Sequence, residues 1–430
     1  MPRSMPLFAQ ARWQAALIMS IVWVSFRPFG TTLADPETGI PPSGGDIINQ
    51  LGFGALGVVC IWLLVVRVNT QILPAFRTPI WVLALPVLAT GAFIADNPSG
   101  ALRAMVFSLI VLLAAATALA LPKRKSELVD AISIAVAITV GFCYCAVFFV
   151  PTQGVHSAVG FEAQHAGLWR GVFDHKNVAS YVMGAFVLMS VFIMRNGRPL
   201  LGAILATMAL IFVLQAGSKT VLGVLPVAIA TAMAARWVTF APLRAIIIMM
   251  PVLTLATVTL GAVLHPPILE WLRGHIPDLS YTGRTDLWVF GLEHLAKHPW
   301  TGHGFESFWG TQRVAGLEQP IELNWDVRGI VHGHNSWLDL AIAFGVPGAV
   351  LLIGALVVLP IRDFMSVPQN SPAVPLANLY ISMWIFTSLG ASLESFFFRR
   401  ADPVWFCMIM AIIGLRIAAH MTRKAATNAR

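Results

Sequence analysis

The stretch VHGHNSWLDLAIAFGVPGAVLLIGALVVLP, residues 331–360, joins two imidazoles and an amide to a long apolar run. A membrane-spanning helix needs about 20 mostly apolar residues, and the run at 336–360 meets that requirement. Polar groups beside a span are costly unless they are used, so His332, His334 and Asn335 mark a candidate functional site. The stretch therefore predicts a membrane helix with chemistry at its start.

The whole chain has the composition of a membrane protein. Of its 430 residues, 57% are hydrophobic and 11% are charged, whereas a soluble chain carries about 25% charged residues. The net charge of +8 is expected to reflect membrane topology rather than affinity for nucleic acid. We predict an all-α polytopic protein forming one integral membrane domain, 1–430. Its twelve spans are expected near 13–29, 50–66, 79–95, 101–121, 128–150, 177–194, 199–215, 220–236, 243–264, 336–360, 376–397 and 403–420.

Loop charges predict the sidedness of the chain. With the N-terminus in the cytoplasm, 16 of the 28 Lys and Arg residues but only three of the 20 acids fall in cytoplasmic segments. This agrees with the excess of Lys and Arg in cytoplasmic loops, and it predicts that both termini are cytoplasmic. A cleaved signal is the alternative for the first span, with a weak small-residue site at 32–34, but the apolar run is long and follows little charge.

Two long segments then lie outside the cytoplasm, 151–176 and 265–335. The external side holds ten of the eleven histidines and 17 of the 20 acids in this topology. Any chemistry is therefore expected on the external face, where no ATP is available. The chain also contains no Gly-rich nucleotide loop.

A first polar cluster, WRGVFDHKN, directly precedes the sixth span. One interpretation is a polar loop in which Asp174 or Asn177 caps the next helix. The other is a clamp for an anionic substrate, formed by Arg170, His175 and Lys176. The sequence does not decide between them.

A second cluster, GSKT, lies in a very short external turn. Ser218 can cap the next helix, whose N-terminus favours anions, and Lys219 adds a full positive charge. These features predict a phosphate site. The alternative is that Lys219 snorkels from a helix end without binding anything.

A third cluster, GRTDLW, opens an amphipathic helix. Arg284 lies in its first turn, where the helix dipole disfavours a cation, and a guanidinium there suits bidentate binding of phosphate. The alternative is an ordinary ion pair with Asp286 or Asp278. The predicted helix has Thr282 or Ser280 as its cap, Leu287, Trp288, Leu292 and Leu295 as its apolar stripe, and Lys297, His298 and Pro299 at its end.

The fourth cluster is the opening one. His334 can accept a proton near neutral pH and is the candidate general base. His332 and His334 also form an H-x-H pair, but no carboxylate at a suitable spacing completes a zinc pattern, so metal binding is the less favoured alternative.

Together these pieces resemble one family. His334-Asn335, nine residues, Gly345, two residues and Gly348 resemble the H-[N/S/Q]-x9-G-x-x-[G/T/Y] signature of the bacterial O-antigen ligase and polysaccharide polymerase superfamily. The stretch GRTDLW…HPWTGHGFESF and the twelve-span layout with one large external loop are similar as well. The family has S-R-T where this chain has Ser218-Lys219-Thr220, and FDHKN with SKT is closer to the exopolysaccharide polymerase branch, the succinoglycan type.

The resemblance implies a metal-independent inverting glycosyltransferase of the C-type membrane fold, without a cofactor, in the bacterial inner membrane with a periplasmic site. The implied donor is a glycan on undecaprenyl pyrophosphate. The implied acceptor is a sugar hydroxyl, on another lipid-linked repeat unit for a polymerase or on lipid A core for a ligase. Chain-length regulators or export proteins are further partners that this activity would use, and nucleic acid is not expected.

On this interpretation, Lys219 and Arg284 hold the pyrophosphate and His334 accepts the proton of the attacking hydroxyl. Asn335 orients His334 or contacts substrate. The aromatic residues of the large loop either stack on sugars or pack the loop. Ser218, Arg170, His175 and Lys176 extend the anion or glycan site.

Two other classes of protein also fit part of the pattern. A transporter or flippase of the same lipid-linked glycans would bind pyrophosphate without chemistry. It would need polar residues deep in its spans, whereas the span centres here are almost uncharged. A structural scaffold would leave the four clusters unexplained.

Overall fold

A computed structural model describes residues 10–29, 46–68, 72–76, 79–159, 163–275, 283–317 and 327–428. Regular structure in this part of the chain is helical, and a single isolated bridge pairs Val155 with Trp169. The chain is thus an all-α protein, as the composition predicts.

Ten helical segments are long and apolar enough to cross a membrane, and two more are shorter apolar helices. These twelve segments match the twelve predicted spans one to one. The short ones have only 14 and 15 residues, below the ~20 needed to span a bilayer at full length. The segments are α1 (Ala11–Val24), α2 (Ile47–Val66), α4 (Pro79–Phe93), α5 (Pro98–Ala120), α6 (Lys125–Phe149), α8 (Lys176–Arg195), α9 (Pro199–Ala216), α10 (Lys219–Trp237), α11 with α12 (Ala241–Ala256, Ala262–Leu264), α16 with α17 (Ser336–Ile353, Leu359–Met365), α18 (Val374–Ala391) and α19 (Pro403–Asn428).

Two of these segments contain a π-helical turn. It lies at Thr257–Gly261 between α11 and α12, and at Gly354–Val358 between α16 and α17. Within α16 the chain also breaks at Gly345, which has φ of +69°. Residues other than glycine rarely adopt that backbone conformation, and a Cβ at this position would lie 2.4 Å from the carbonyl oxygen of Trp300. The signature glycine therefore has a structural reason.

The eleventh predicted span, 376–397, ends too late. The helix α18 stops at Ala391, and residues 392–402 form a turn in which Phe398 and Arg400 have positive φ. The polar side chains at the start of this turn bond to the residues before α16, as described below, and so do not continue the helix.

The helices α8, α18 and α19 form the centre of the bundle, with about three quarters of each apolar window buried. Trp23 of α1, Phe186 of α8 and Phe406 of α19 meet there edge to face. The segments α2 and α11–α12 lie outside, and less than a third of each window is buried. Their exposed apolar surface is the surface that lipid would cover.

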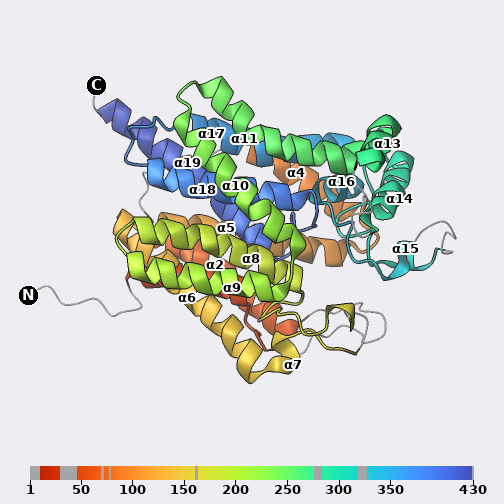
Figure 1. Ribbon diagram of the computed structural model, residues 1–430, viewed down its shortest axis with the longest axis horizontal. Helices are drawn as coiled ribbons and strands as arrows, with labels where there is room; N and C mark the ends of the chain where they lie inside the picture. The colour runs from red at the N-terminus through yellow and green to blue at the C-terminus, as the bar shows by residue number, and fades with distance from the viewer. Residues whose placement is uncertain are drawn as a thin grey trace, which may run out of the picture.

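Short helices cover one end of the bundle (Figure 1). The segment between α12 and α16 folds there around its own apolar cluster, in which Leu287, Trp288 and Val314 are fully buried. The helix α19 ends at the opposite end. The short helices at the covered end are α7 (Pro151–Gly154), α13 (Pro266–His275), α14 (Arg284–Lys297), α15 (Gln312–Ala315) and the 3-10 turns Ala163–His165 and Val327–Gly329. The short helix α3 (Leu73–Phe76) instead packs against α19, where Arg416 donates to the carbonyl of Ala75 at 2.9 Å.

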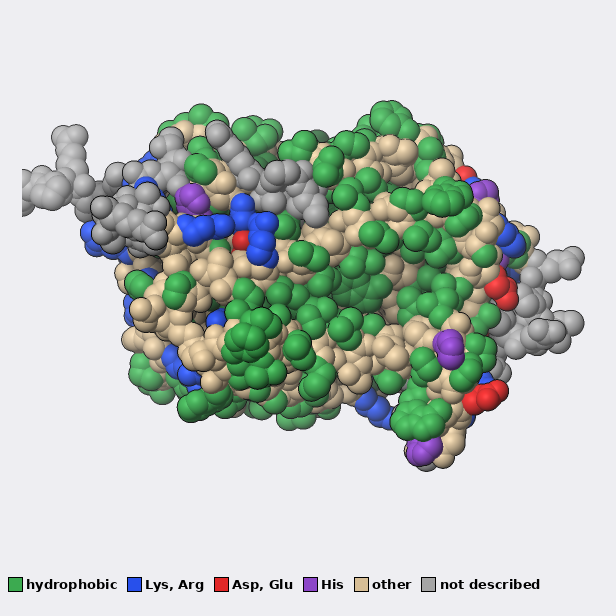
Figure 2. All heavy atoms as spheres, turned by 90° about the horizontal axis from the view of Figure 1, so that it is seen from above, with side chains coloured by type: hydrophobic (Ala, Val, Ile, Leu, Met, Phe, Trp, Pro, Cys, Tyr) green, Lys and Arg blue, Asp and Glu red, His purple; other side chains and the backbone are tan. Residues whose placement is uncertain are grey.

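The two ends of the helix bundle differ in charge. Figure 2 shows Lys and Arg gathered at one end around few acids, whereas most of the acids and histidines in view lie at the other end. The end that carries α13, α14 and α15 is therefore the expected location of the functional site.

Candidate active site

Glu394, in the turn after α18, joins three of the four polar clusters. Its Oε1 accepts from Arg284 Nη2 at 2.7 Å and from Asn177 Nδ2 at 2.7 Å. Its Oε2 lies 3.0 Å from His334 Nδ1. The side chains of Arg284, His334 and Glu394 are only 12%, 18% and 10% exposed. The three residues form a nearly buried array, which we call the His–Glu–Arg array.

The array is held by bonds between two turns distant in the sequence. The backbone N–H of Asn335 donates to Ser395 Oγ at 3.0 Å, and its side-chain Nδ2 donates to the carbonyl of Ser392 at 3.2 Å. Ser336 Oγ donates to the carbonyl of Glu394 at 2.8 Å. The turn that carries the carboxylate is thus fixed to the turn that carries the imidazole.

Asn335 has two further roles that its place in the sequence motif explains. It is fully buried at the N-cap of α16, where its Oδ1 accepts from the N–H groups of Trp337 and Leu338. Asparagine is among the best residues at this position because its oxygen satisfies N–H groups that the helix leaves free. His334, the residue before it, has φ of +51°. Asn335 therefore places His334 through the backbone.

The electrostatics fix the form of His334. Burial opposes ionisation of Glu394, but nearby His334 and Arg284 outweigh it and lower the pKa of that carboxyl far below its usual range. Glu394 is therefore an acceptor only, so His334 Nδ1 must carry the proton of their hydrogen bond. In neutral His334 the other ring nitrogen, Nε2, then carries no proton and is the atom that can accept one.

His332 lies against His334, with ring centroids 4.1 Å apart. Its Nδ1 accepts from the His334 N–H at 3.4 Å. Burial, with His334 and Arg399 nearby, lowers the pKa of His332 well below its usual value. His332 is thus neutral at pH 7 and adds no charge to the site.

Arg284 is the first residue of α14, after Gly283 with φ of +82°. Its guanidinium pairs with Glu394; Asp278, one of the two acids expected for an ordinary pair, lies outside the described residues, as do the expected caps Ser280 and Thr282. The helix ends at Lys297 as predicted, and its stripe packs into the apolar cluster of the loop. Phe308 is also buried there, Phe305 is buried in the core of the bundle, and Trp300 is 77% exposed.

The first cluster begins α8, but its cap differs from both expected residues. His175 is the N-cap, and its Nδ1 accepts from the Asn177 N–H at 3.1 Å. Neither Asp174 nor Asn177 caps the helix, and the amide of Asn177 binds Glu394 instead. The guanidinium of Arg170 donates to backbone carbonyls, with Nε 2.7 Å from that of Gln153.

The α8 start also brings further histidines together. The backbone N–H of Lys176 donates to His156 Nε2 at 3.1 Å. The rings of His156, His165 and His175 lie 5.2–5.6 Å apart, and His175 is close enough to affect the titration of His332. The first and fourth clusters are therefore neighbours.

The second cluster adjoins the first one. Trp169 N–H donates to the carbonyl of Gln215 at 3.3 Å, and Gly217 lies against Leu168. Ser218 occupies the N-cap position of α10 and is buried, but its hydroxyl makes no capping bond, contrary to the expectation. Lys219 is exposed and has no bond to the His–Glu–Arg array among the described residues.

The same site revives the question of a metal. Ligand atoms of His332, His334 and Glu394 lie within 4.8 Å of one another. The sequence argument against metal failed on this point, because the carboxylate comes from a part of the chain 60 residues away. However, Oε1 already accepts two bonds, one of them from a guanidinium, whose charge opposes a cation at the same carboxylate. The arrangement favours a proton-accepting histidine.

Two residues of the site were missed in the sequence. Glu394 is the one charged residue in the predicted span 376–397, and an acid within a span is by default a functional candidate. Arg399, which donates to the carbonyl of Ser395 at 3.2 Å, lies in the same turn. The first had a signal in the sequence that was not used.

The fold and the array define a polytopic membrane protein with an acid-supported histidine at one end of its bundle. Residues 178–353 match the model of a family described as O-Antigen ligase. The chain is also 26% identical over 265 residues to an O-antigen ligase of Pseudomonas aeruginosa, an alignment covering 60% of this chain and 58% of that relative. The chain thus spans less than two thirds of the relative's length.

The chain is therefore similar to O-antigen ligases over part of its length. The matched range contains Lys219, Arg284 and His334 but ends before Glu394.

Proposed function

We propose that the chain transfers a glycan from undecaprenyl pyrophosphate to a sugar hydroxyl with inversion, and that it polymerises exopolysaccharide or O-antigen repeat units. The observation that supports this most is the hydrogen bond between His334 and Glu394 beside Arg284. This arrangement brings together a proton acceptor, His334, and a cation, Arg284. Transfer from a pyrophosphate donor needs both.

The reaction assigns each group one task. The hydroxyl oxygen of the acceptor attacks the anomeric carbon while His334 Nε2 takes its proton. The bond from the anomeric carbon to the pyrophosphate oxygen breaks with its electron pair, and undecaprenyl pyrophosphate leaves. Glu394 stabilises the imidazolium that forms. A general base of this kind contributes about 10²–10⁴ in rate.

The cations act on the leaving group. Arg284 uses Nη2 for Glu394, and a guanidinium has five N–H donors, so further donors remain for phosphate. Lys219 is exposed at the start of α10 and supplies a second positive charge. Each such group is worth roughly 10²–10³ in rate. Asn335 orients His334, and Ser218 with Arg170, His175 and Lys176, at and before the start of α8, completes the wall around donor or acceptor.

We infer the same topology as the loop charges predict. The site lies on the periplasmic face of the bacterial inner membrane, with both termini in the cytoplasm and the segments 151–176 and 265–335 outside. Supporting this, Lys and Arg gather at the end opposite the site (Figure 2). Chain-length regulators or export proteins would work beside the enzyme, and neither metal nor cofactor takes part in the step.

A ligase that moves the glycan to lipid A core is the second candidate, because the relative from Pseudomonas aeruginosa is named an O-antigen ligase. Depletion of the protein, followed by extraction of lipid-linked glycans, separates the two. Accumulated single repeat units support the polymerase. Long chains stranded on the carrier lipid support the ligase, and unchanged glycan pools contradict both.

A flippase is the rival of another class. In the described spans, charged side chains lie near the helix ends, and the array lies beyond the end of α18. A flippase would move intact lipid-linked glycan in vesicles without forming a new glycosidic bond. Purified protein that joins two repeat units in detergent would exclude that activity as the sole one.

A further inference from the structure

A second polar site lies at the basic end of the bundle, opposite the His–Glu–Arg array. Arg244, in the first turn of α11, is only 8% exposed, and its Nε has no hydrogen-bond partner among the described residues. A buried polar group without a partner costs free energy comparable to a lost hydrogen bond, and a charged one costs more. The guanidinium of Arg244 is therefore a candidate for binding a ligand.

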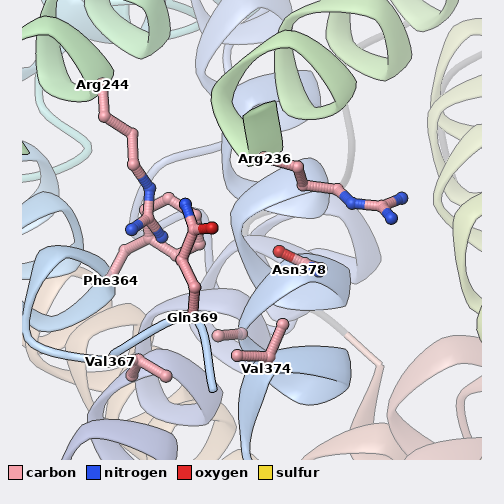
Figure 3. A pocket seen from close by; sticks show the side chains of 8 residues that line it. Arg236, Arg244, Phe364, Val367, Gln369, Val374 and Asn378 are labelled. Atoms are coloured by element: carbon pink, nitrogen blue, oxygen red, sulfur yellow. The ribbon is translucent and has the colours of Figure 1, made fainter. Parts of the chain in front are cut away.

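The side chain of Arg244 reaches into a cavity between helices (Figure 3). Its guanidinium carbon lies 4.1 Å above the ring centre of Phe364, which covers one face of the cation but satisfies none of its N–H groups. The cavity has a volume of about 190 Å³, room for several water molecules at ~30 Å³ each. It is lined by Arg236, Arg244, Phe364, Val367, Gln369, Val374, Ala377 and Asn378.

The lining selects an anion. It contains two arginines and two carboxamides, with no acid. Arg244 is also near the N-terminus of the 16-residue helix α11, whose free N–H groups and dipole favour negative charge. Arg236 contributes an exposed second cation from the end of α10.

The acidic residue closest in sequence to the cavity lining is Asp363, and it already has ion-pair partners. Asp363 precedes Phe364, and its side chain is 3% exposed. It binds Arg416 at 2.9 Å, with Arg423 at 3.9 Å. It therefore leaves the charge of Arg244 unbalanced.

The surroundings identify the anion as part of a lipid. The turn between α10 and α11 exposes Trp237 to 83% and Phe240 to 66%, and aromatic side chains of this kind concentrate where a membrane meets water. Four apolar side chains complete the cavity wall. Basic pockets between membrane helices at the cytoplasmic side are suited to anionic headgroups. We propose that this cavity binds the phosphate of an anionic phospholipid headgroup, with Arg244 as its main ligand.

The test uses the purified full chain in detergent. Phosphatidylglycerol, phosphatidylcholine and inorganic phosphate are added separately, and both the thermal unfolding temperature and the number of bound lipids by native mass spectrometry are measured. Phosphatidylglycerol should raise the unfolding temperature and remain bound, and the other two probes should do so much less. Arg244→Leu should weaken phosphatidylglycerol binding roughly tenfold or more, the loss expected for charge-assisted hydrogen bonds.

Two variants keep the result interpretable. Arg195→Leu removes an exposed cation from the end of α8 and should bind phosphatidylglycerol as the wild type does. Arg244→Lys keeps the charge and should retain part of the binding. Equal binding by Arg244→Leu and wild type overturns the proposal. An equal effect of inorganic phosphate overturns the lipid assignment, and equal binding of phosphatidylcholine overturns the selection for an anion.

Discussion

His334 Nδ1 and Glu394 Oε2 lie 3.0 Å apart, although 60 residues separate them in the chain. The carboxylate is ionised because Arg284 and His334 lower its pKa against the effect of burial. The pair therefore holds the neutral imidazole in the tautomer with an unprotonated Nε2, which is the form that accepts a proton. In the proposed reaction this is the form that the attacking hydroxyl needs.

His334→Ala should reduce glycan transfer by about 10²–10⁴ while the protein still accumulates in the membrane. The ring is 18% exposed and Asn335 still caps α16, so the fold should survive. Product is measured by gel analysis of polymer in cells, with a tagged protein as loading control. Near-normal product from this variant contradicts the assignment of His334 as the base.

Glu394→Gln should also lower transfer strongly, because the amide cannot stabilise the imidazolium as a carboxylate does. Its effect should fall on kcat rather than KM. Glu306→Gln, which breaks the exposed pair with Arg400, serves as the matched control and should leave both unchanged. An unchanged kcat in Glu394→Gln would contradict the proposed role of the carboxylate.

Lys219→Arg should retain more activity than Lys219→Ala. The residue is exposed at the start of α10, and its proposed role is a positive charge for the leaving pyrophosphate. Initial rates with saturating acceptor give the comparison. Equal loss in the two variants argues against a charge role.

EDTA should leave transfer intact even though His332, His334 and Glu394 are close enough to share an ion. Arg284 at Glu394 Oε1 disfavours a cation there. Activity of the purified enzyme is followed before and after chelation. A loss that a divalent ion restores would support the metal alternative.

Asp402→Asn should stabilise the protein at neutral pH. Burial raises the pKa of Asp402 to about 6, above the ~3.9 of an unfolded aspartate, so the folded state favours the protonated form. The free energy of unfolding therefore falls as pH rises from about 4 to about 6 and stays lower above that range. Asparagine keeps the oxygen that caps Val404 and Trp405 without the buried charge.

Thermal unfolding in detergent at pH 7.5 and pH 4.5 measures this effect. The Asn variant should unfold at a higher temperature than wild type at pH 7.5, with a smaller difference at pH 4.5. Asp130→Asn, which removes the pairs with Arg12 and Arg198, should show no gain. The same difference at both pH values would contradict the titration of Asp402.

The sequence was sufficient for the helices because their signal is local. Each apolar run is long enough to identify a span by itself, and all twelve correspond to a helix. The predicted end of the eleventh span was wrong, because Ser392, Ser395 and their neighbours look like part of an apolar run in the sequence. In the structure this turn forms hydrogen bonds with Asn335 and Ser336. Such bonds between distant turns leave no periodic pattern.

The same limit applies to the site. Arg284 and His334 were identified from their own surroundings in the chain, but the residue that joins them was not. The cap of α8 was also assigned wrongly, because several side chains near the helix start were equally suited to capping and tertiary contacts decided among them. Ser218 does occupy the N-cap position of α10, but its hydroxyl makes no capping bond. Lys219 is separate from the array among the described contacts, so its role stays a prediction.

The bonds from Asn335 and Ser336 to the turn at 392–396 have a further consequence for the kinetics. They attach the proton acceptor and its carboxylate to a single stiff frame between the ends of two membrane helices. Both side chains of the pair are already in the reactive arrangement before a substrate binds, so little reorganisation energy is needed before the proton moves. Whatever motion admits a long lipid-linked glycan is therefore expected in other parts of the enzyme.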